Sequence, residues 1–212
     1  MIYNSQEEEA AVPTEQLLRH LLRKSFKHSK IPEFPLASGR FSDSYVDCKI
    51  ALSDPEVREL VGELILQSLD PKSIDVVGGL ELGAYPVAIA VSDVCYRLTG
   101  AHLRVFIVRK EPKPHGLRKW VEGEVHDGDR ALIVDDVVTS GKSTLSAVEK
   151  AKSEGISVVK AVAVVDREEG GEALFRSERI PFEALVTLRQ LKNARKAQDL
   201  EKKLVDDGAP AL

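Results

Sequence analysis

Cysteine is scarce in this sequence, where Cys48 and Cys95 are the only two. They lie far apart and outside any C-x-x-C spacing, so we expect neither a structural zinc site nor a disulfide framework. Two reduced thiols buried in a core, as in a cytoplasmic protein, are the simpler expectation.

Long apolar runs are also missing. No run approaches the ~18 residues that a membrane span needs. The start, 1-MIYNSQEEEA-10, is acidic where a signal peptide would be basic and then apolar. We therefore expect a cytoplasmic protein that does not engage a membrane.

A surplus of positive charge is lacking as well. The formal net charge is −4, so any affinity for polyanions must come from a local basic cluster. This balance disfavours a nucleic-acid partner. The 212 residues are 43% hydrophobic and 30% charged, which is typical of a globular protein with one sizeable core.

The glycines of the two common nucleotide motifs are absent too. Gly141-Lys142-Ser143 matches the end of a G-x-x-x-x-G-K-[ST] phosphate loop, but Asp136 stands where that loop needs its first glycine. A carboxylate at that position would repel the phosphate. The stretch 78-GGLELG-83 lacks the second glycine of the dinucleotide motif G-x-G-x-x-G. Neither motif describes the site.

The chain divides into a short tail and a single domain. Leucine pairs at 17–18 and 21–22 have helical spacing and follow Pro13-Thr14. We therefore expect residues 1–12 to form a flexible tail and residues 13–212 to form one domain.

Two kinds of element are predicted next. The stretch 34-FPLASGRFSDSYVDCKIAL-52 is rich in Gly, Ser and aromatic residues, which predicts short strands in a hairpin. Ser53-Asp54-Pro55-Glu56 is typical of a helix start. The buried face of that helix is expected at Leu60, Val61, Leu64 and Ile65.

Strands and helices then alternate, which predicts an α/β fold with a central parallel sheet flanked by helices. The expected elements are strands at 74–77, 104–108, 131–134, 158–165 and 182–188, and helices at 87–98, 143–154 and 189–203.

Unusual residues follow four of these strands: Gly78-Gly79, Arg109-Lys110, Asp135-Asp136 and Asp166-Arg167. Ligands of open parallel sheets bind beyond the carboxyl ends of the strands. Each pair alone is explained by a solvated loop, but together they indicate one crevice.

The segment from Asp135 to Ser143 combines carboxylates with a helix start. Free amides and the positive end of the helix dipole favour an anion, and Thr139, Ser140 and Ser143 add hydroxyl donors. Simple capping is the alternative for these hydroxyl residues. The two aspartates suit a vicinal diol or hydrated Mg²⁺. A 5-phosphorylated ribose presents both a phosphate and a diol.

The loop 109-RKEPKPHGLRKWVEGEVHDG-128 is long and basic in an otherwise acidic protein. Loops of this length in compact domains are usually functional lids or disordered. We interpret this one as a mobile lid for a polyphosphate, with a solvated basic loop as the alternative.

These residues together resemble a known family. The segment 132-LIVDDVVTSGKS-143 resembles the phosphoribosyl-diphosphate (PRPP) motif of type I phosphoribosyltransferases. The segment 107-IVRKEPKPHG-116 is similar to the mobile loop of the orotate phosphoribosyltransferases, and the match extends through 34–47 and 166–167. The resemblance implies a small N-terminal hood and a long mobile catalytic loop. It also implies a homodimeric, Mg²⁺-dependent enzyme that converts orotate and PRPP to orotidine 5′-monophosphate and diphosphate.

The resemblance further implies a role for each matched residue. Lys113, His115 and Asp136 are expected to be catalytic, and Asp135 and Asp136 are candidate contacts of the magnesium that PRPP carries. Orotate is expected to contact Thr139, Arg167, Tyr45 and Val46. PRPP is expected to contact Arg109, Lys110, Lys113, His115, Asp135, Asp136, Val137, Val138, Thr139, Ser140, Gly141, Lys142 and Ser143.

Two departures and two alternatives remain. Ala37 and Leu82-Gly83 replace a lysine and a Tyr-Lys pair of many members. In 78-GGLELGAYP-86, Glu81 and Tyr85 replace the Thr and Asp of a second group of the family.

Two alternative functions remain. A transferase for another base would keep the phosphate site without needing Arg167. A regulator that senses PRPP and binds nucleic acid would need a basic face, for which 189–203 is the only candidate.

Overall fold

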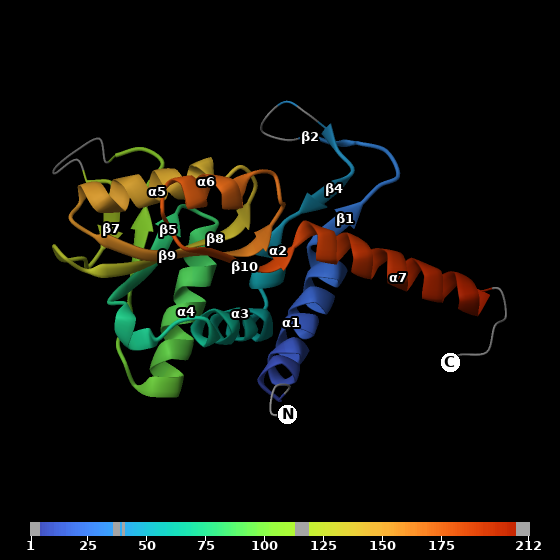
Figure 1. Ribbon diagram of the computed structural model, residues 1–212, viewed down its shortest axis with the longest axis horizontal. Helices are drawn as coiled ribbons and strands as arrows, with labels where there is room; N and C mark the ends of the chain where they lie inside the picture. Colours follow the sequence, from blue (N-terminus) through green and yellow to red (C-terminus); the bar gives the residue numbers. More distant parts are fainter. Residues whose placement is uncertain (1–4, 36–38, 40, 113–118, 207–212) are drawn as a thin grey trace.

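The fold is a six-stranded sheet between two layers of helices, with a small hood at one end (Figure 1). The structure, a computed structural model, describes residues 5–35, 39, 41–112 and 119–206, with side chains described only between residues 13 and 203. Within that part of the chain, no helix is both long and apolar enough to cross a bilayer.

The central sheet is parallel except at one edge. Its strands are β5 (Val76–Leu80), β6 (Arg104–Val108), β7 (Val121–Gly123), β8 (Arg130–Val138), β9 (Ser157–Asp166) and β10 (Phe182–Thr187). They lie in the order β10-β9-β8-β5-β6-β7, and only β7 is antiparallel to its neighbour. The predicted parallel sheet is therefore confirmed. Strand β7 was not predicted, because it lies in the segment interpreted as a loop.

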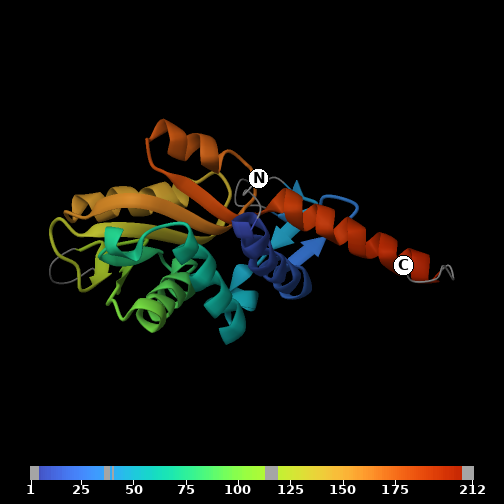
Figure 2. The same cartoon turned by 60° about the horizontal axis from the view of Figure 1, so that its bottom comes forward.

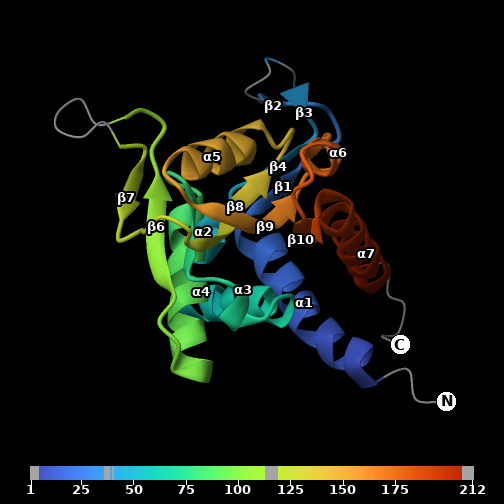
Figure 3. The same ribbon diagram turned by 60° about the vertical axis from the view of Figure 1, so that its left-hand side comes forward.

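Helices cover both faces of this sheet (Figure 3). The helices are α1 (Ser5–Lys24), α2 (Cys48–Leu52), α3 (Pro55–Gln67), α4 (Ala84–Thr99), α5 (Lys142–Ser153), α6 (Gly171–Ser177) and α7 (Leu188–Asp206), with a 3₁₀ turn at Pro71–Ser73. Successive residues of β8 point to opposite faces, as strand geometry requires. Leu132 and Val134 join the core beneath α1 to α4, whereas Ala131 and Ile133 join the core beneath α5 and α6.

Helix α3 begins as the sequence predicts, with one change of cap. The carboxylate of Asp54, rather than Ser53, accepts the bond from the Glu56 amide, and Pro55 is the first helical residue. The predicted buried face is confirmed, since Leu60, Val61, Leu64 and Ile65 are all buried.

The N-terminal helix is longer than predicted. Helix α1 begins at Ser5, so the expected flexible tail does not extend to residue 12. The run 7-EEEAA-11 consists of strong helix formers, which favour extension of the helix toward the N-terminus. Pro13 lies inside the helix.

The hood combines two small antiparallel pairs. Strand β2 (Phe34–Pro35) pairs with β3 (Phe41–Ser42), and β1 (Phe26–His28) pairs with β4 (Ser44–Val46). The predicted hairpin is thus present, but residues 48–52 form α2 instead of a strand. The Asp47 carboxylate accepts a bond from the Lys49 amide and caps this short helix, a local signal that the strand interpretation overlooked.

Helix α7 leaves the sheet beside the hood and projects from the body (Figure 2). Leu191 is fully buried near its start, whereas the residues from Glu201 to Lys203 are exposed. Arg195 links α7 to α1 by donating to the Leu22 carbonyl at 2.8 Å. The charged tail predicted as a surface helix is confirmed.

Candidate active site

The carboxyl ends of β5, β6, β8 and β9 meet at one edge of the sheet, as parallel pairing requires. Arg109 follows β6, Asp135 and Asp136 lie within β8, and Asp166 ends β9 before Arg167. Three of the four predicted pairs therefore lie at this edge of the sheet, and the crevice between them stays a prediction.

The fourth pair has a packing role. Gly78 and Gly79 lie inside β5, where a methyl group on either would come within 2.1 Å of the Phe106 or Val134 carbonyl oxygen. Glycine is needed there because neighbouring strands approach closely.

The segment from Val137 to Ser143 forms an open helix start. Gly141 has a φ of 78°, and no side chain caps the first amides of α5. A methyl group on Gly141 would lie 3.2 Å from both the Gly171 Cα and Phe175 Cε2 atoms, so the turn needs glycine. Free amides at a helix N-terminus form an anion site.

Side chains around this turn divide into exposed and core-facing groups. Thr139 and Ser143 are exposed, and among the described residues neither their hydroxyls nor that of Ser140 has a hydrogen-bond partner. Lys142 is exposed as well. Val138 is 1% exposed and packs beneath α5, and Val137 packs on the opposite face. The side chain of Val138 is therefore closed to a ligand, whereas that of Val137 is half-buried.

The two aspartates are adjacent in sequence but have partners on opposite faces of the sheet. Asp135 Oδ2 accepts a bond from the Thr144 hydroxyl of α5 at 2.6 Å, and its Oδ1 accepts from the Asp136 amide at 3.0 Å. Asp136 Oδ2 lies 3.2 Å from Lys49 Nζ of α2. Asp135 is thus held by hydrogen bonds from Thr144 and from the Asp136 amide. Asp136 is instead paired with Lys49, whose long side chain is 57% exposed.

Burial raises the pKa of Asp135 to about 7, although the Thr144 hydrogen bond opposes the rise. The neighbouring charge of Asp136 adds to it. Two carboxylates so close cannot both ionise easily in a buried site. The positive charge of Lys49 lies beside Asp136.

Lys49 is a site residue that the sequence did not reveal. Its Nζ lies 3.2 Å from Asp47 Oδ1 and 3.2 Å from Asp136 Oδ2. Desolvation opposes the charge of Lys49, but these carboxylates outweigh it and raise the pKa of Lys49 above its usual value. No motif joins residues 87 positions apart. The only available signal was a lysine just after the matched stretch 34–47.

Gly83 closes over the same aspartates. A methyl group on Gly83 would lie 2.2 Å from Asp136 Oδ1 and 3.2 Å from Asp135 Oδ1. Leu82-Gly83 replaces the Tyr-Lys pair of many members. Because Gly83 has no side chain, its backbone can approach the two carboxylates closely.

Arg167 connects the sheet edge to the hood. Its side chain is 4% exposed, and Nε donates to Glu169 Oε1 at 2.8 Å. Its terminal nitrogens donate to the Ser44 carbonyl at 3.3 Å and the Ser42 hydroxyl at 3.2 Å. Arg167 therefore does pair with Glu169, but its side chain is buried and not at the surface. Glu169 also has a further contact.

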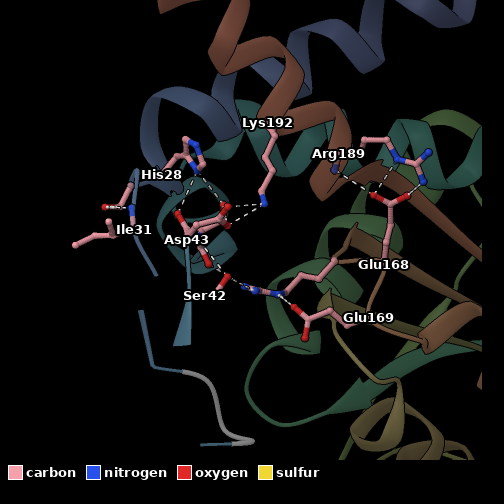
Figure 4. A network of polar contacts seen from close by, with 11 residues as sticks. His28, Ile31, Ser42, Asp43, Glu168, Glu169, Arg189 and Lys192 are labelled. Carbon is pink, nitrogen blue, oxygen red and sulfur yellow. Dashed lines mark hydrogen bonds and ion pairs between the residues drawn. The ribbon is translucent and has the colours of Figure 1, made fainter. Parts of the chain in front are cut away.

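The surroundings of this arginine are fixed by other ion pairs (Figure 4). Lys192 of α7 donates to both carboxylate oxygens of Asp43, at 2.8 and 3.0 Å. Arg189 pairs with Glu168. These contacts join α7 to the hood through Asp43 and to the segment after β9 through Glu168.

The two hood residues predicted to contact orotate differ in direction. Tyr45 is 39% exposed, and its ring stacks on Phe34 with centroids 5.9 Å apart. Val46 is 7% exposed and packs in the core. Only Tyr45 of the two presents its side chain outward.

Arg109 and Lys110 begin the long loop at the same sheet edge. Arg109 Nη1 lies 3.4 Å from Glu122 Oε1, and the Lys110 amide donates to Glu81 Oε1 at 2.8 Å. Glu81, a departure from the related sequences, thus holds the loop backbone. Lys113 and His115 lie outside the described residues.

Comparison with known proteins identifies the family. Residues 51–177 match the phosphoribosyl transferase domain family. The chain is 40% identical over 177 residues to the orotate phosphoribosyltransferase of Aquifex aeolicus, covering 84% of this chain and 96% of that protein.

Solved structures agree with this relative. The crystal structure of Mycobacterium tuberculosis orotate phosphoribosyltransferase with Fe(III) dicitrate has a TM-score of 0.73 and 34% identity, covering 84% of this chain and 98% of that one. The complex of the Mycobacterium tuberculosis enzyme with PRPP has a TM-score of 0.67 and 28% identity, covering 85% of this chain and 92% of that one. By sequence and by fold, the chain belongs to the orotate phosphoribosyltransferases, within the type I phosphoribosyltransferase fold.

Proposed function

We propose that this protein transfers the 5-phosphoribosyl group from PRPP to orotate, giving orotidine 5′-monophosphate and diphosphate in pyrimidine (UMP) biosynthesis. One observation carries the proposal: the uncapped start of α5 directly follows the Asp135-Asp136 pair at the carboxyl end of β8. This arrangement suits a ribose that carries a 5-phosphate and a vicinal diol.

In the proposed complex, the amides and hydroxyls from Thr139 to Ser143 bind the 5-phosphate. Asp136 accepts hydrogen bonds from the ribose diol, and its present partner Lys49 gives up or shares that carboxylate. Asp135 stays beneath, held by Thr144. The protein thus places charge and donors where the sugar needs them before reaction.

The reaction breaks the bond between C1 of the ribose and the diphosphate, and a ring nitrogen of orotate forms the new bond to C1. Little proton transfer is needed, so the main contributions are orientation and neutralisation of the leaving group's charge. Arg109, Lys110, Lys113 and His115 are proposed to face the diphosphate. Exclusion of water by the loop protects the electron-poor C1 atom.

Magnesium is part of the proposal. Mg²⁺ is commonly held by one or two carboxylates together with substrate phosphates and water. Asp135 and Asp136 offer such oxygen atoms beside the phosphate site, and a ligand at Asp136 Oδ2 would displace Lys49. Asp136 would help to hold Mg²⁺ bound to PRPP, and the ion would neutralise diphosphate charge there.

We also propose a cytoplasmic homodimer in which loop 109–128 acts across the interface. Apolar side chains beside the site support an interface: Ile50, Leu82 and Tyr85 are 49%, 73% and 47% exposed. Leu82 adjoins Gly83, and Ile50 adjoins Lys49, so a partner on this surface would lie next to the aspartates. The two thiols, both buried and free, suit a reducing compartment.

Orotate differs from uracil by a carboxylate, and Arg167 is the proposed partner for it. Its planar guanidinium can form two hydrogen bonds with a carboxylate. Thr139 and Tyr45 are proposed to contact the ring, and Val46 to contribute through its backbone. A site whose charged donor is left unpaired by uracil discriminates strongly against it.

The experiment mixes protein, Mg²⁺ and PRPP with orotate, uracil, adenine or hypoxanthine and measures which base is consumed. We expect orotate alone to be converted at a high rate. Arg167→Ala should lower kcat/KM for orotate by about 10- to 150-fold, since a charge-assisted hydrogen bond is worth roughly 1.5 to 3 kcal/mol. KM for PRPP should change far less.

The control is Arg176→Ala, which removes an arginine that is 77% exposed and paired within α6. Because Arg167 also bonds to the hood, thermal unfolding of each variant is measured alongside. Preferred consumption of another base would contradict the proposal. A folded Arg167→Ala protein within twofold of wild type would remove Arg167 from base selection.

A further inference from the structure

Lys150 lies on α5 about two turns after the phosphate site at its start, far along the sequence from the catalytic loop. Its Nζ nevertheless donates to the carbonyl oxygens of Arg109 and Lys110, each at 3.0 Å. The same ammonium group lies 4.2 Å from the ring centroid of Trp120. One side chain therefore contacts both ends of the segment between β6 and β7, which starts at Arg109 and ends at Trp120.

Two further hydrogen bonds join the ends of this segment to each other and to the end of α5. The Arg109 amide donates to the Trp120 carbonyl at 2.9 Å. The Trp120 amide donates to Glu154 Oε1, just beyond α5, at 2.9 Å. The two ends are thus joined to each other and to one helix end.

The chemistry of these contacts fits a lysine better than a neutral residue. Hydrogen bonds from a charged donor are shorter and stronger than neutral ones, and a cation over an indole face is attracted by the ring. Lys150 is half-buried, which limits the screening of its charge. The lysine directs three favourable contacts at the loop base.

We propose that Lys150 is a positioning residue for the transfer reaction, which holds Arg109 and Lys110 in register with the phosphate site at the start of α5. This inference rests on the proposed function, in which those two residues face the diphosphate. Helix α5 then fixes the distance between the groups that hold the 5-phosphate and those that meet the leaving group. Lys150 acts through the loop backbone and touches no substrate.

The test compares Lys150→Met with a matched control on the same helix. Lys150→Met keeps the length of the side chain but removes the donors and the charge. Lys152→Met makes the same change at an exposed position of α5 for which no side-chain contact is found within the described residues. We expect Lys150→Met to lower kcat/KM for PRPP by about 10-fold or more relative to Lys152→Met.

Two further readings separate positioning from general stability. KM for orotate and the midpoint of thermal unfolding should stay close to those of Lys152→Met. Lys150→Arg should recover most of the activity, because a guanidinium group also donates to two carbonyls and stacks on an aromatic ring. Equal kinetics for the two Met variants, or a parallel loss of stability and all kinetic constants, would overturn the inference.

The single tryptophan supplies a reading that does not depend on turnover. Because Lys150 lies over the Trp120 ring, Lys150→Met should change the emission of the free protein, while Lys152→Met should leave it as in wild type. Unchanged emission would overturn the contact. A wild-type protein that forms no orotidine 5′-monophosphate would instead overturn the proposed function, whatever the emission shows.

Discussion

At the scale of single residues, the two aspartates lie side by side at the end of β8 but differ in their partners. Asp135 faces α5 and bonds to Thr144, whereas Asp136 faces α2 and Lys49. Burial raises the pKa of Asp135 to about 7, and Lys49 keeps a positive charge beside Asp136. The pair therefore separates a structural carboxyl group from one that is available for ligand.

The raised pKa of Asp135 predicts how stability depends on pH. Between about pH 4 and pH 7 the unfolded chain has lost this proton while the folded protein keeps it, so the stability that Asp135 contributes falls as pH rises. The amide of Asp135→Asn cannot ionise, so this variant does not lose stability in this way as pH rises. The difference between its unfolding midpoint and that of wild type should therefore shift in favour of the variant from pH 5 to pH 8. Loss of the carboxylate acceptor lowers the stability of the variant by an amount that does not depend on pH.

Asp75→Asn is the matched control. The hydrogen bond from Arg130 lowers the pKa of Asp75 to about 2, so its pH-dependent contribution is lost only below about pH 4. The difference between Asp75→Asn and wild type should be constant from pH 5 to pH 8. Parallel curves for Asp135→Asn and wild type over that range would refute the assignment of a protonated buried carboxyl group.

At the scale of elements, the sequence predicted the parts that follow a long regular pattern. The parallel strands and α3 to α5 have continuous apolar faces, so their positions are close to those expected, although β8 extends through both aspartates to Val138. Short elements escaped prediction. Strand β7 and α6 carry too few residues for a period to emerge, and their stability comes from tertiary packing.

The candidate site shows the same division. The turn from Val137 to Ser143 and the two aspartates are local in sequence, and the structure places them together as expected. Lys49, Lys150 and Trp120 act through contacts between distant segments, which no local pattern contains. Arg167 was singled out correctly as a strand-end residue, but its bonds to the hood needed the fold to be known.

At the scale of the whole molecule, the proposed dimer makes a test by mixing possible. If loop 109–128 serves the neighbouring subunit, a loop variant such as Lys113→Ala and a site variant such as Asp136→Asn damage different halves of each composite site. Mixed dimers then contain one site with both parts intact. Two inactive preparations should regain up to about a quarter of wild-type activity after subunit exchange, as random pairing of two subunits predicts.

The control mixes the single variant Asp136→Asn with a double variant that carries both Asp135→Asn and Asp136→Asn. Every pairing of these subunits lacks an intact site. Sedimentation of the wild type should show a dimer at assay concentration. Mixtures that stay inactive despite proven exchange would show that each subunit uses its own loop.

The most direct measurement of the central claim is product formation by wild type and Asp136→Asn with limiting PRPP, Mg²⁺ and orotate. Wild type should form orotidine 5′-monophosphate and diphosphate in equal amounts. Asp136→Asn should lose about 100-fold or more in kcat/KM for PRPP, because two charge-assisted bonds to the ribose are weakened. Asp199→Asn, an exposed change on α7, should not differ from wild type. A folded Asp136→Asn protein with wild-type turnover, or a wild type that forms neither product, would contradict the account.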